Sequence, residues 1–329
     1  MGKESVNHAH LANQALVAYG LADAKRIFIR HSDTFSYKVE TAGGDIYLLR
    51  LHIPLNQAMG THGADYAAVN SELLWLEALC QESDLVLQQP VRNLSGALVT
   101  EVQSPEDSET INCTLLHWLT GEPYHRDLET GDTAFQIGKI AATLHDHASR
   151  WEVPAGFVRP NRDIAYFKKV LQGIQPAVTD GRISAADYKE LEISVGLLVK
   201  QLECTRKNRQ TYGLMHADMH KGNMLLHQGQ IRLIDFSFCA FGIFMFDLAV
   251  GMSDMKEELH RAFLEGYRSQ RSFPSEYQRL VEGLFVGSMV GAFSYWVPNP
   301  DAAALLSRKV PQIAQEFAVK YNRGEHFWF

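Results

Sequence analysis

Four side chains that could bind a metal ion or move a proton lie in one short stretch of the chain, from Leu214 to Phe238. They are His216, Asp218, Asn223 and Asp235. Transfer of a phosphoryl group from ATP to a hydroxyl needs one carboxylate that orients and deprotonates the acceptor. It also needs hard oxygen ligands for the Mg²⁺ that neutralises the phosphates. We assign the first role to Asp218 and the second to Asn223 and Asp235.

The spacing of these residues supports the assignment. The pattern D-x-x-x-x-N puts Asp218 and Asn223 on one loop, with Asn223 entering a strand. The apolar run Met224–Leu226, the turn residues after it and the alternating segment Ile231–Leu233 predict a β-hairpin. That hairpin is expected to return Asp235 to the neighbourhood of Asn223.

Each of these residues taken alone has a simpler explanation. Asp and Asn beside Gly are common turn residues, and an H-x-D triplet can be a capping pair. The joint pattern is what favours a site, because protein kinases combine a catalytic-loop Asp, a metal-binding Asn and an Asp-Phe-Gly aspartate in this order. Asp235-Phe236-Ser237 stands here in place of Asp-Phe-Gly.

The chain resembles the aminoglycoside phosphotransferase and choline kinase family of small-molecule kinases. The loop of that family reads H-G-D-L-H-x-G-N, followed by I-D-[FW], and residues His216–Asn223 and Ile234–Phe236 fill these places. Ala217 and Lys221 replace the commoner Gly and Pro. The His at position 220 separates this family from protein kinases, which have Lys there. The resemblance extends to Leu144-His145, Phe246-Asp247-Leu248-Ala249 and Gly266-Tyr267.

The resemblance implies an α+β, bilobal, protein-kinase-like fold. Its small antiparallel N-terminal lobe is expected over residues 1–116, a hinge over 117–121, and a larger, mostly helical lobe over 122–329. It implies that His216 supports the catalytic loop. Asp247, which follows Asp235 too closely for the activation segment of a protein kinase, is expected to brace that loop or to cap the next helix.

Hydrophobic periodicity predicts elements that agree with this fold. A helix is expected over residues 7–19, and strands over 26–30, 35–41, 46–51, 98–102 and 111–116. From Thr133 onward the period changes from two to 3.6 residues, which indicates helices. ATP is expected in the cleft between the lobes. The apolar end His326–Phe329 is expected to dock on the body of the protein.

Six further residues are candidates for nucleotide binding. Arg50 ends a strand where kinases carry the Lys that contacts the α and β phosphates, and Glu72 on the next helix is its expected partner. The first strand turn offers the small hydroxyl residues Ser32 and Thr34 for a phosphate. His117 and Leu119, in the expected hinge, are predicted to contact adenine through their main chains.

Composition excludes several classes of protein. The 329-residue chain is 46% hydrophobic and 21% charged, as in globular proteins. Its net charge of −7 and lack of a basic cluster argue against nucleic-acid binding, and no apolar run is long enough to span a membrane. The four scattered cysteines and the polar N-terminus predict reduced thiols in a cytoplasmic protein.

The sequence thus predicts an ATP- and Mg²⁺-dependent kinase. Its acceptor would be a hydroxyl of an amino alcohol, amino acid or amino sugar, and the net charge is compatible with a cationic acceptor. The protein would act as a monomer or homodimer. Two alternatives stay open at this point: a protein Ser/Thr kinase of the same fold, and a nucleotide-binding module without catalytic activity.

Overall fold

The computed structural model describes residues 6–31, 34–53, 65–104 and 109–329 of the chain. The chain divides into two compact units. The first contains residues 1–121, 152–159 and 234–238, and the second contains residues 122–151, 160–233 and 239–329. The first boundary between the two units, after residue 121, lies at the end of the segment 117–121 that the sequence suggested as a hinge. Two short segments from later in the chain join the first unit.

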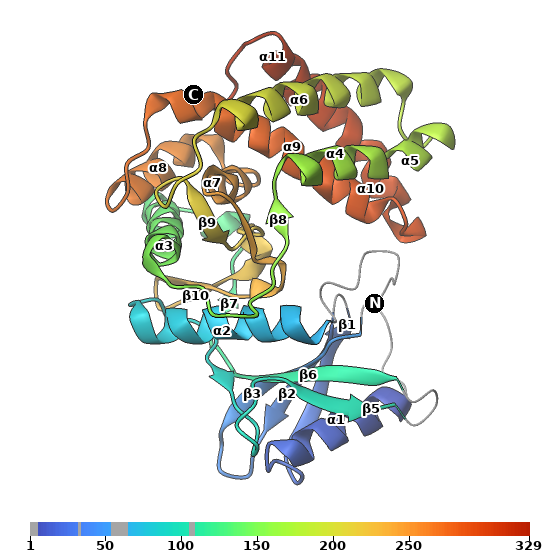
Figure 1. Cartoon of the computed structure of the whole chain (residues 1–329), viewed down its shortest axis with the longest axis vertical. Coiled ribbons are helices and arrows are strands. Elements are labelled where there is room, and N and C mark those ends of the chain that lie inside the picture. Colours follow the sequence, from blue (N-terminus) through green and yellow to red (C-terminus); the bar gives the residue numbers. More distant parts are fainter. Residues whose placement is uncertain (1–5, 32–33, 54–64, 105–108) are drawn as a thin grey trace. The chain divides into compact units, whose positions relative to one another are not determined.

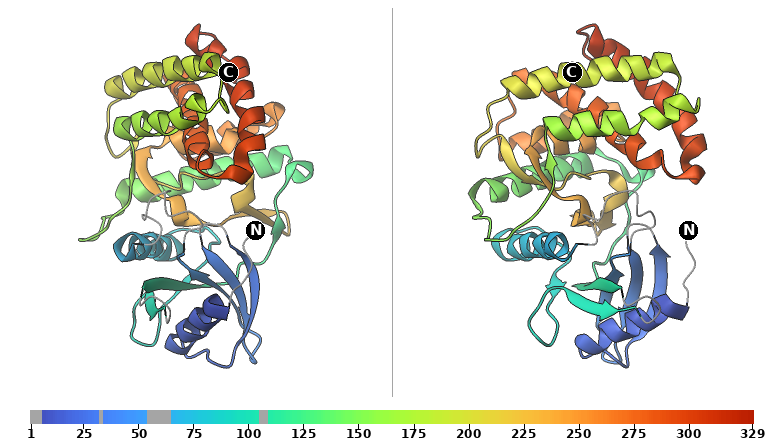
Figure 2. Two further views of the ribbon diagram at one scale, coloured as in Figure 1. Left: turned by 90° about the vertical axis from the view of Figure 1, so that its right-hand side faces the viewer. Right: turned by 45° about the vertical axis from the view of Figure 1, so that its right-hand side comes forward.

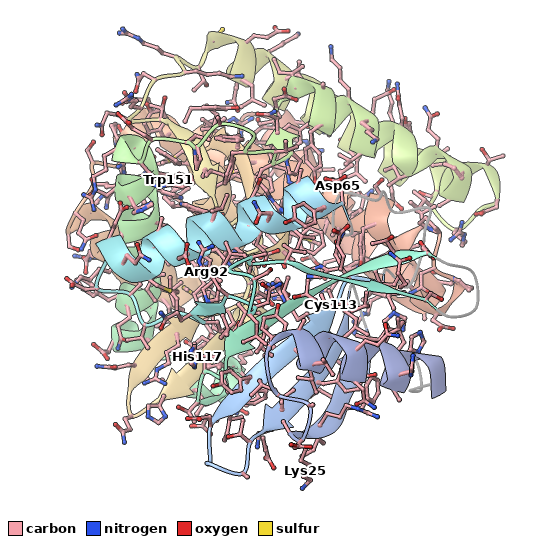
Figure 3. The ribbon with its side chains drawn as sticks, turned by 60° about the horizontal axis from the view of Figure 1, so that its bottom comes forward. Lys25, Asp65, Arg92, Cys113, His117 and Trp151 are labelled. Carbon is pink, nitrogen blue, oxygen red and sulfur yellow. The ribbon has the colours of Figure 1, made fainter. Side chains whose placement is uncertain are left out.

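The first unit is built on an antiparallel sheet whose strands follow the order β1-β2-β3-β6-β4, with β5 also paired to β6 (Figure 1). The strands are β1 (Lys25–His31), β2 (Phe35–Glu40), β3 (Ile46–Leu51), β4 (Pro90–Val91), β5 (Thr100–Gln103) and β6 (Thr110–His117). Its helices are α1 (Val6–Ala18) and α2 (Tyr66–Glu82). Asp65, labelled in Figure 3, caps α2 by accepting a hydrogen bond from the amide of Ala68.

Alternation along β3 assigns the two helices to opposite faces of this sheet. Leu49 and Leu51 face a core that α1 completes, whereas Arg50 between them points to Glu72 on α2. Figure 2 shows α1 and α2 on opposite sides of the sheet in both views. The apolar core residues on the α1 side are Leu11, Ala12, Ala15, Leu16, Tyr19, Phe35, Tyr37, Val39, Leu49, Leu51, Val102, Ile111, Cys113 and Leu115.

The second unit is mostly helical. Its α-helices are α3 (Gly131–Arg150), α4 (Ile164–Gly173), α5 (Gln175–Thr179), α6 (Ala185–Cys204), α7 (Met245–Met252), α8 (His260–Arg268), α9 (Gln278–Trp296), α10 (Ala303–Gln312) and α11 (Val319–Asn322). A π-helical turn, η9 (Ile313–Ala318), joins the last two. Helices α4, α6 and α9 pack against one another.

Two small sheets lie among these helices and carry the candidate site. One has the order β11-β10-β7 and the other the order β8-β12-β9. Their strands are β7 (Glu122–Pro123), β8 (Asn161–Arg162), β9 (Tyr212–Met215), β10 (Met224–His227), β11 (Gln230–Leu233) and β12 (Ala240–Ile243). The chain leaves β9 directly into the loop that contains Asp218.

Helices α3 and α8 touch backbone to backbone through two glycines. A Cβ atom at Gly138 would lie 1.8 Å from the carbonyl oxygen of Phe263, and one at Gly266 would lie 2.0 Å from that of Phe135. Any larger residue would force these helices apart. The close contact explains the glycine of the Gly266-Tyr267 pair and brings Tyr267 against α3.

The C-terminal segment docks as the sequence suggested. The fully buried carboxylate of Glu282 on α9 accepts hydrogen bonds from the amides of Phe327 and Trp328, at 2.6 and 3.0 Å, and it contacts the ring of His326 at 2.9 Å. The rings of Phe327 and Trp328 pack against Phe285. Glu282 therefore holds the end of the chain in place.

The expected α+β class, with an antiparallel N-terminal sheet and a helical C-terminal part, is confirmed. The predicted strands and hairpin occur within two residues of their expected ends, but the two-residue strands β4, β7 and β8 and the four-residue strands β9 and β12 were not predicted. All four cysteines are free. Within the described ranges, no helix has the length and apolar character needed to cross a membrane.

Candidate active site

The loop after β9 is closed by hydrogen bonds around Asp218. The amide nitrogen of the Asn223 side chain donates to the carbonyl of Asp218 at 3.0 Å and to its carboxylate at 2.7 Å. The main-chain amide of His220 donates to the same carbonyl at 2.8 Å. The structure therefore brings Asp218 and Asn223 together.

The ring of His220 lies against the Asp218 carboxylate, with 3.4 Å between its Nε2 atom and Oδ2. Its Nδ1 atom accepts a hydrogen bond from the amide of Gly222, so Nε2 carries the proton that faces Asp218. Burial opposes the charged form of Asp218, but the hydrogen bonds from His220 and Asn223 and the electrostatic effect of the His220 and His216 rings outweigh it. The pKa of Asp218 therefore lies below its ordinary value, and the carboxylate is ionised at neutral pH.

The carboxylate of Asp247 holds the start of this loop. It accepts hydrogen bonds from the main-chain amides of His216, at 2.9 Å, and Ala217, at 2.7 Å. Nδ1 of the fully buried His216 ring accepts one from the amide of Asp218 at 3.2 Å. Asp247 makes no side-chain cap on α7, so its interpretation as a helix cap is wrong.

Two further buried residues orient Asp247. Nε2 of His145 lies 3.1 Å from Oδ2 of Asp247, and Nδ1 of His145 lies 3.1 Å from the hydroxyl of Tyr267. Burial lowers the pKa of His145, although the neighbouring Asp247 carboxylate opposes the change. The ring is therefore neutral, with its proton on Nε2 toward Asp247 and the Tyr267 hydroxyl donating to Nδ1.

Ala217 takes up a left-handed backbone conformation, with φ at 61°. This conformation costs an L-residue roughly 1–2 kcal/mol, which explains why the related loop pattern usually has Gly here. The hydrogen bond from the Ala217 amide to the charged Asp247 carboxylate offsets the cost.

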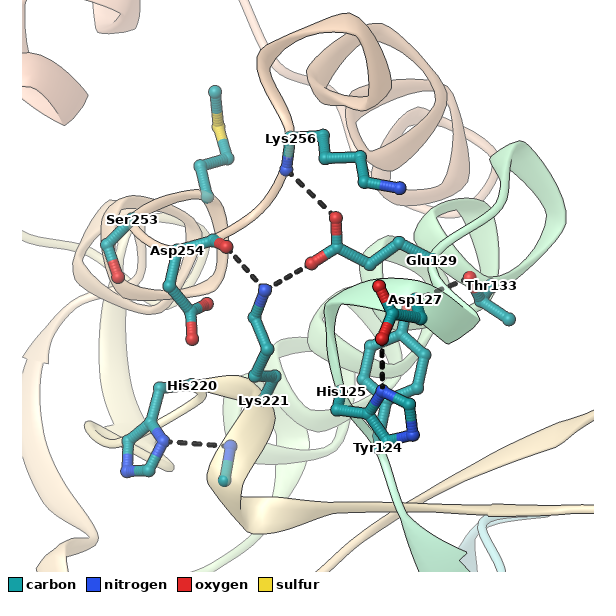
Figure 4. A network of polar contacts seen from close by, with 12 residues as sticks. Tyr124, His125, Asp127, Glu129, Thr133, His220, Lys221, Ser253, Asp254 and Lys256 are labelled. Carbon is teal, nitrogen blue, oxygen red and sulfur yellow. Dashed lines mark hydrogen bonds and ion pairs between the residues drawn. The ribbon is translucent and has the colours of Figure 1, made fainter.

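Lys221 anchors the other end of the loop (Figure 4). Its ammonium group donates to the carboxylate of Glu129 and to the main-chain carbonyl of Asp254, and Glu129 also accepts from the amide of Lys256 at 3.1 Å. The Glu129 side chain is only 1% exposed. Lys221, at a position where the related pattern has Pro, thus links the loop to the segments before α3 and after α7.

The predicted hairpin after Asn223 is present. Met224 pairs with Leu233 and His227 with Gln230. Gln228 and Gly229 form the turn with φ values of 51° and 78°, as in a type I′ turn. The hairpin leads directly to Ile234 and Asp235, the first residues of a short segment that belongs to the first unit.

Asp235 also has a left-handed backbone, with φ at 65°. Its Oδ1 atom accepts a hydrogen bond from the Ser237 hydroxyl at 2.6 Å, and its Oδ2 atom lies 3.8 Å from the guanidinium of Arg30 on β1. Arg159 joins the same segment to α2, because it donates to the carbonyls of Ser237 and Ala68. Ser237, which replaces the glycine of Asp-Phe-Gly, therefore fixes the orientation of the Asp235 carboxylate.

Arg50 forms the predicted ion pair with Glu72. Nη2 of Arg50 lies 2.8 Å from Oε1 of Glu72, and its Nε atom donates to the Thr114 hydroxyl at 3.2 Å. Burial alone would lower the pKa of Arg50, but the carboxylates of Glu72 and Asp235 raise it above its ordinary value. Within the described chain no acceptor is bound to Nη1, so this nitrogen can donate to a phosphate oxygen.

The remaining nucleotide candidates differ in how much the structure describes. Ser32 lies outside the described residues. Thr34 is buried, with its hydroxyl 3.2 Å from that of Ser36. At the end of β6 (Figure 3), the amide of His117 donates to the carbonyl of Gln89. Leu119 is half-buried, and its amide has no hydrogen-bond partner among the described residues.

Asn223 and Asp235, each taken by itself, offer the kind of oxygen ligand that Mg²⁺ prefers. Because the Asn223 amide nitrogen is used by Asp218, its Oδ1 oxygen is the atom that can bind a metal, and Asp235 provides a carboxylate. No group of three His, Cys, Asp or Glu side chains suited to a metal occurs in the part of the chain that the structure describes. Mg²⁺ is commonly bound by one or two protein ligands together with substrate phosphates.

Sequence reasoning missed several residues of the site. Arg30, Glu129 and Arg159 had no local signal, since each meets its partner far away in the sequence. His145 and Tyr267 lie in the segments Leu144-His145 and Gly266-Tyr267, which the family resemblance had marked. His145 is hydrogen-bonded to both Tyr267 and Asp247, and it thereby connects these two segments to the one that contains Asp247.

Comparisons with known proteins agree with this geometry. The model of the phosphotransferase enzyme family (APH) matches residues 34–281. The homoserine kinase of Neisseria meningitidis serogroup B (strain ATCC BAA-335 / MC58) is 25% identical over 204 residues. The alignment covers 59% of this chain and 60% of that kinase, so the chain spans less than two thirds of its relative's length.

Two solved structures have similar folds. A microcompartment-associated aminopropanol kinase superposes with a TM-score of 0.79 at 24% identity, and the match covers 96% of this chain and 98% of that one. An amicoumacin kinase in complex with AMP-PNP, Ca²⁺ and Ami superposes with a TM-score of 0.73 at 16% identity, over 97% and 94% of the two chains. These similarities confirm the predicted fold.

Proposed function

Because the chain belongs to the phosphotransferase enzyme family, we propose that it transfers the γ-phosphate of ATP to a hydroxyl group of a small molecule in the presence of Mg²⁺. The observation that carries this proposal is the closed loop in which Asn223 and His220 hold an ionised Asp218 carboxylate. The homoserine kinase and aminopropanol kinase to which the chain is similar are named for small amino-substituted alcohols. An amino alcohol, amino acid or amino sugar is therefore the proposed acceptor class.

Asp218 is the proposed catalytic residue. Its ionised carboxylate accepts a hydrogen bond from the acceptor hydroxyl and orients that oxygen for in-line attack. A carboxylate of lowered pKa is a weak base, so it takes the proton only late, as the bond to phosphorus forms. His220 and Asn223 stabilise the charge and fix the rotamer of Asp218.

We assign the metal to Oδ1 of Asn223 and the carboxylate of Asp235. When bound, Mg²⁺ supplies positive charge that neutralises the phosphate oxygens during transfer. Ser237 and Arg30 position the Asp235 carboxylate, and the bond from Asn223 to Asp218 couples the metal ligand to the catalytic residue.

Arg50 is proposed to bind the α and β phosphates through Nη1, with Glu72 and Thr114 keeping the guanidinium in place. Ser32 and Thr34 are proposed to line the phosphate-binding turn. The amide of Leu119 and the carbonyl of His117 are the proposed main-chain contacts to adenine. His216 and Asp247 support the catalytic loop and do not contact substrate.

A direct test uses the purified full chain with ATP, Mg²⁺ and a panel of amino alcohols, hydroxy amino acids and aminoglycosides. Formation of ADP and the mass of the phosphorylated acceptor are measured. Replacement of Asp218 by Asn should lower kcat by at least about 100-fold, because orientation and proton transfer are both lost. Asp235→Asn should lower it comparably, and should raise the Mg²⁺ concentration required.

The matched control is Asp127→Asn, which removes a carboxylate that is 93% exposed from the same unit as Asp218. This variant should keep the activity of the unchanged protein. Circular dichroism and thermal melting check that each variant folds. Transfer at nearly unchanged rates by the Asp218→Asn protein would refute the assignment of the catalytic residue.

A further inference from the structure

Arg162 on β8 has no acidic partner among the residues that the structure describes. Its guanidinium carbon lies 4.3 Å from the centre of the Tyr166 ring. Its Nε atom is buried without a hydrogen-bond acceptor, and none of the described carboxylates comes within 4.0 Å of the guanidinium. Asp163, the next residue, uses its carboxylate to accept the amide of Tyr166 as the cap of α4. A partly buried guanidinium that lacks an acceptor for Nε and a nearby carboxylate is suited to bind the anion of a ligand.

In the sheet β8-β12-β9, Arg162 lies on the same face as Met215, the last residue before the catalytic loop. Arg162 pairs with Gly242, which pairs in turn with Gly213. A Cβ atom at Gly242 would lie 2.3 Å from the methyl carbon of Met215 and 3.3 Å from Cβ of Arg162. Met215 and Arg162 therefore meet over Gly242, and Asp218 follows Met215 by three positions.

The phenol of Tyr166 senses the charges of both Arg162 and Asp218. Burial is the main cause that raises the pKa of Tyr166, while the positive charge of Arg162 lowers it and the negative charge of Asp218 raises it. Both charges therefore act on the same phenol. The ring is held in place against α9, because a Cβ atom at Gly291 would lie 2.4 Å from its hydroxyl oxygen.

From this arrangement we infer that Arg162 binds a carboxylate of the acceptor while Asp218 orients the hydroxyl of the same molecule. The inference rests on the proposed function and narrows its acceptor class to small hydroxy acids, including hydroxy amino acids. A guanidinium presents two parallel N–H donors that match a carboxylate. The same cation repels a polycationic amino sugar, which argues against an aminoglycoside as the natural acceptor.

The test compares acceptors that differ only in the carboxylate. Three pairs serve: serine with ethanolamine, threonine with isopropanolamine, and homoserine with propanolamine. The unchanged protein should favour the acid of at least one pair in kcat/KM. Arg162→Gln should raise KM for that acid by about 10- to 100-fold, the range expected for a hydrogen-bonded charge, and leave kcat/KM for its carboxylate-free partner unchanged.

Arg162→Lys, which keeps the charge, should restore part of the preference. Lys168→Gln, a change at an exposed position on α4, should leave it intact. Equal losses for both members of a pair would overturn the inference, since Arg162 would then act on the nucleotide or on the fold. A preference for the carboxylate-free members would overturn it as well.

A second measurement separates this inference from the proposed function. The thermal stabilisation of the protein by each compound is measured in the presence of a non-hydrolysable ATP analogue and Mg²⁺. If no compound is phosphorylated, the proposed function fails for this panel. The carboxylate inference still stands if the acids stabilise the unchanged protein more than their partners do and Arg162→Gln removes that difference. It is overturned if the acids give no larger shift.

Discussion

Replacement of Asp247 by Asn should destabilise the protein far more than its small change in shape suggests. The carboxylate has no exposed surface and receives three donors: the amides of His216 and Ala217 and Nε2 of His145. Oδ2 takes the donors from His216 and His145, and Oδ1 takes the one from Ala217. The Asn side chain keeps one acceptor oxygen and puts an NH₂ group in place of the other.

Either orientation of the new amide leaves a buried donor without an acceptor. If its oxygen occupies the Oδ2 position, the amide of Ala217 faces NH₂. If the oxygen occupies the Oδ1 position, the main-chain amide of His216 faces NH₂. A move of the His145 proton to Nδ1 would let Nε2 accept from NH₂, but it would not help the His216 amide. An unsatisfied buried amide costs about 1–3 kcal/mol, and the surviving bonds lose the strength that the charge gave them, about another 1 kcal/mol. We therefore expect the free energy of unfolding to fall by about 2–4 kcal/mol.

Equilibrium urea denaturation measures this change, and the kcat of phosphoryl transfer measures the effect on the loop. The control is Glu265→Gln, an equally small change at a half-exposed carboxylate paired with Arg261. It should cost less than about 0.5 kcal/mol. A loss below about 1 kcal/mol in the Asp247→Asn protein would show that the loop does not depend on these bonds.

Two further predictions follow from backbone conformation and from a buried ring. Gln228→Asn should stabilise the hairpin β10–β11 by about 0.5 kcal/mol, because Asn adopts the observed φ of 51° more readily and Asn-Gly is the preferred type I′ turn. Urea denaturation and hydrogen exchange of the hairpin amides measure this change. The folded state lowers the pKa of His145 below its unfolded value of about 6.5, so its contribution to stability is complete above that pH and is lost as the pH falls through the folded pKa. The free energy of unfolding should therefore decrease as the pH falls from neutral to mildly acidic. His145→Gln should make this decrease smaller. The decrease that remains comes from His260, because burial lowers its pKa as well. An unchanged pH dependence in the His145→Gln protein would contradict the neutral, buried ring.

The sequence was sufficient to predict the elements whose signals are local. The hairpin after Asn223 combines an apolar run, a glycine turn and an alternating segment, and β3 has the expected bounds, Ile46–Leu51. The pair Arg50 and Glu72 was predictable because a strand and the next helix bring them together in a fixed order. In each case consecutive elements of the chain determine the structure.

The rest depends on pairs that are distant in sequence. Strand β8 has two residues, too few to show a period, so nothing marked Arg162 as part of a sheet with β12 and β9. Lys221 and Glu129 form their ion pair across 92 positions, and His145 meets Asp247 across 102. A buried acid and a buried base look like surface residues until the fold places them together.

The two substitutions in the catalytic loop are best understood through these distant pairs. Gly at position 217 would adopt positive φ without strain, and Pro at position 221 would fix its own φ. Here Ala217 keeps a strained φ because Asp247 binds its amide, and Lys221 is held by Glu129 and Asp254. Buried charge therefore offsets the backbone strain at Ala217 and fixes the other end of the loop through Lys221. It follows that the position of Asp218 depends on residues of α3, α7 and the segment before α3, and that substitutions there should alter kcat without touching the substrate.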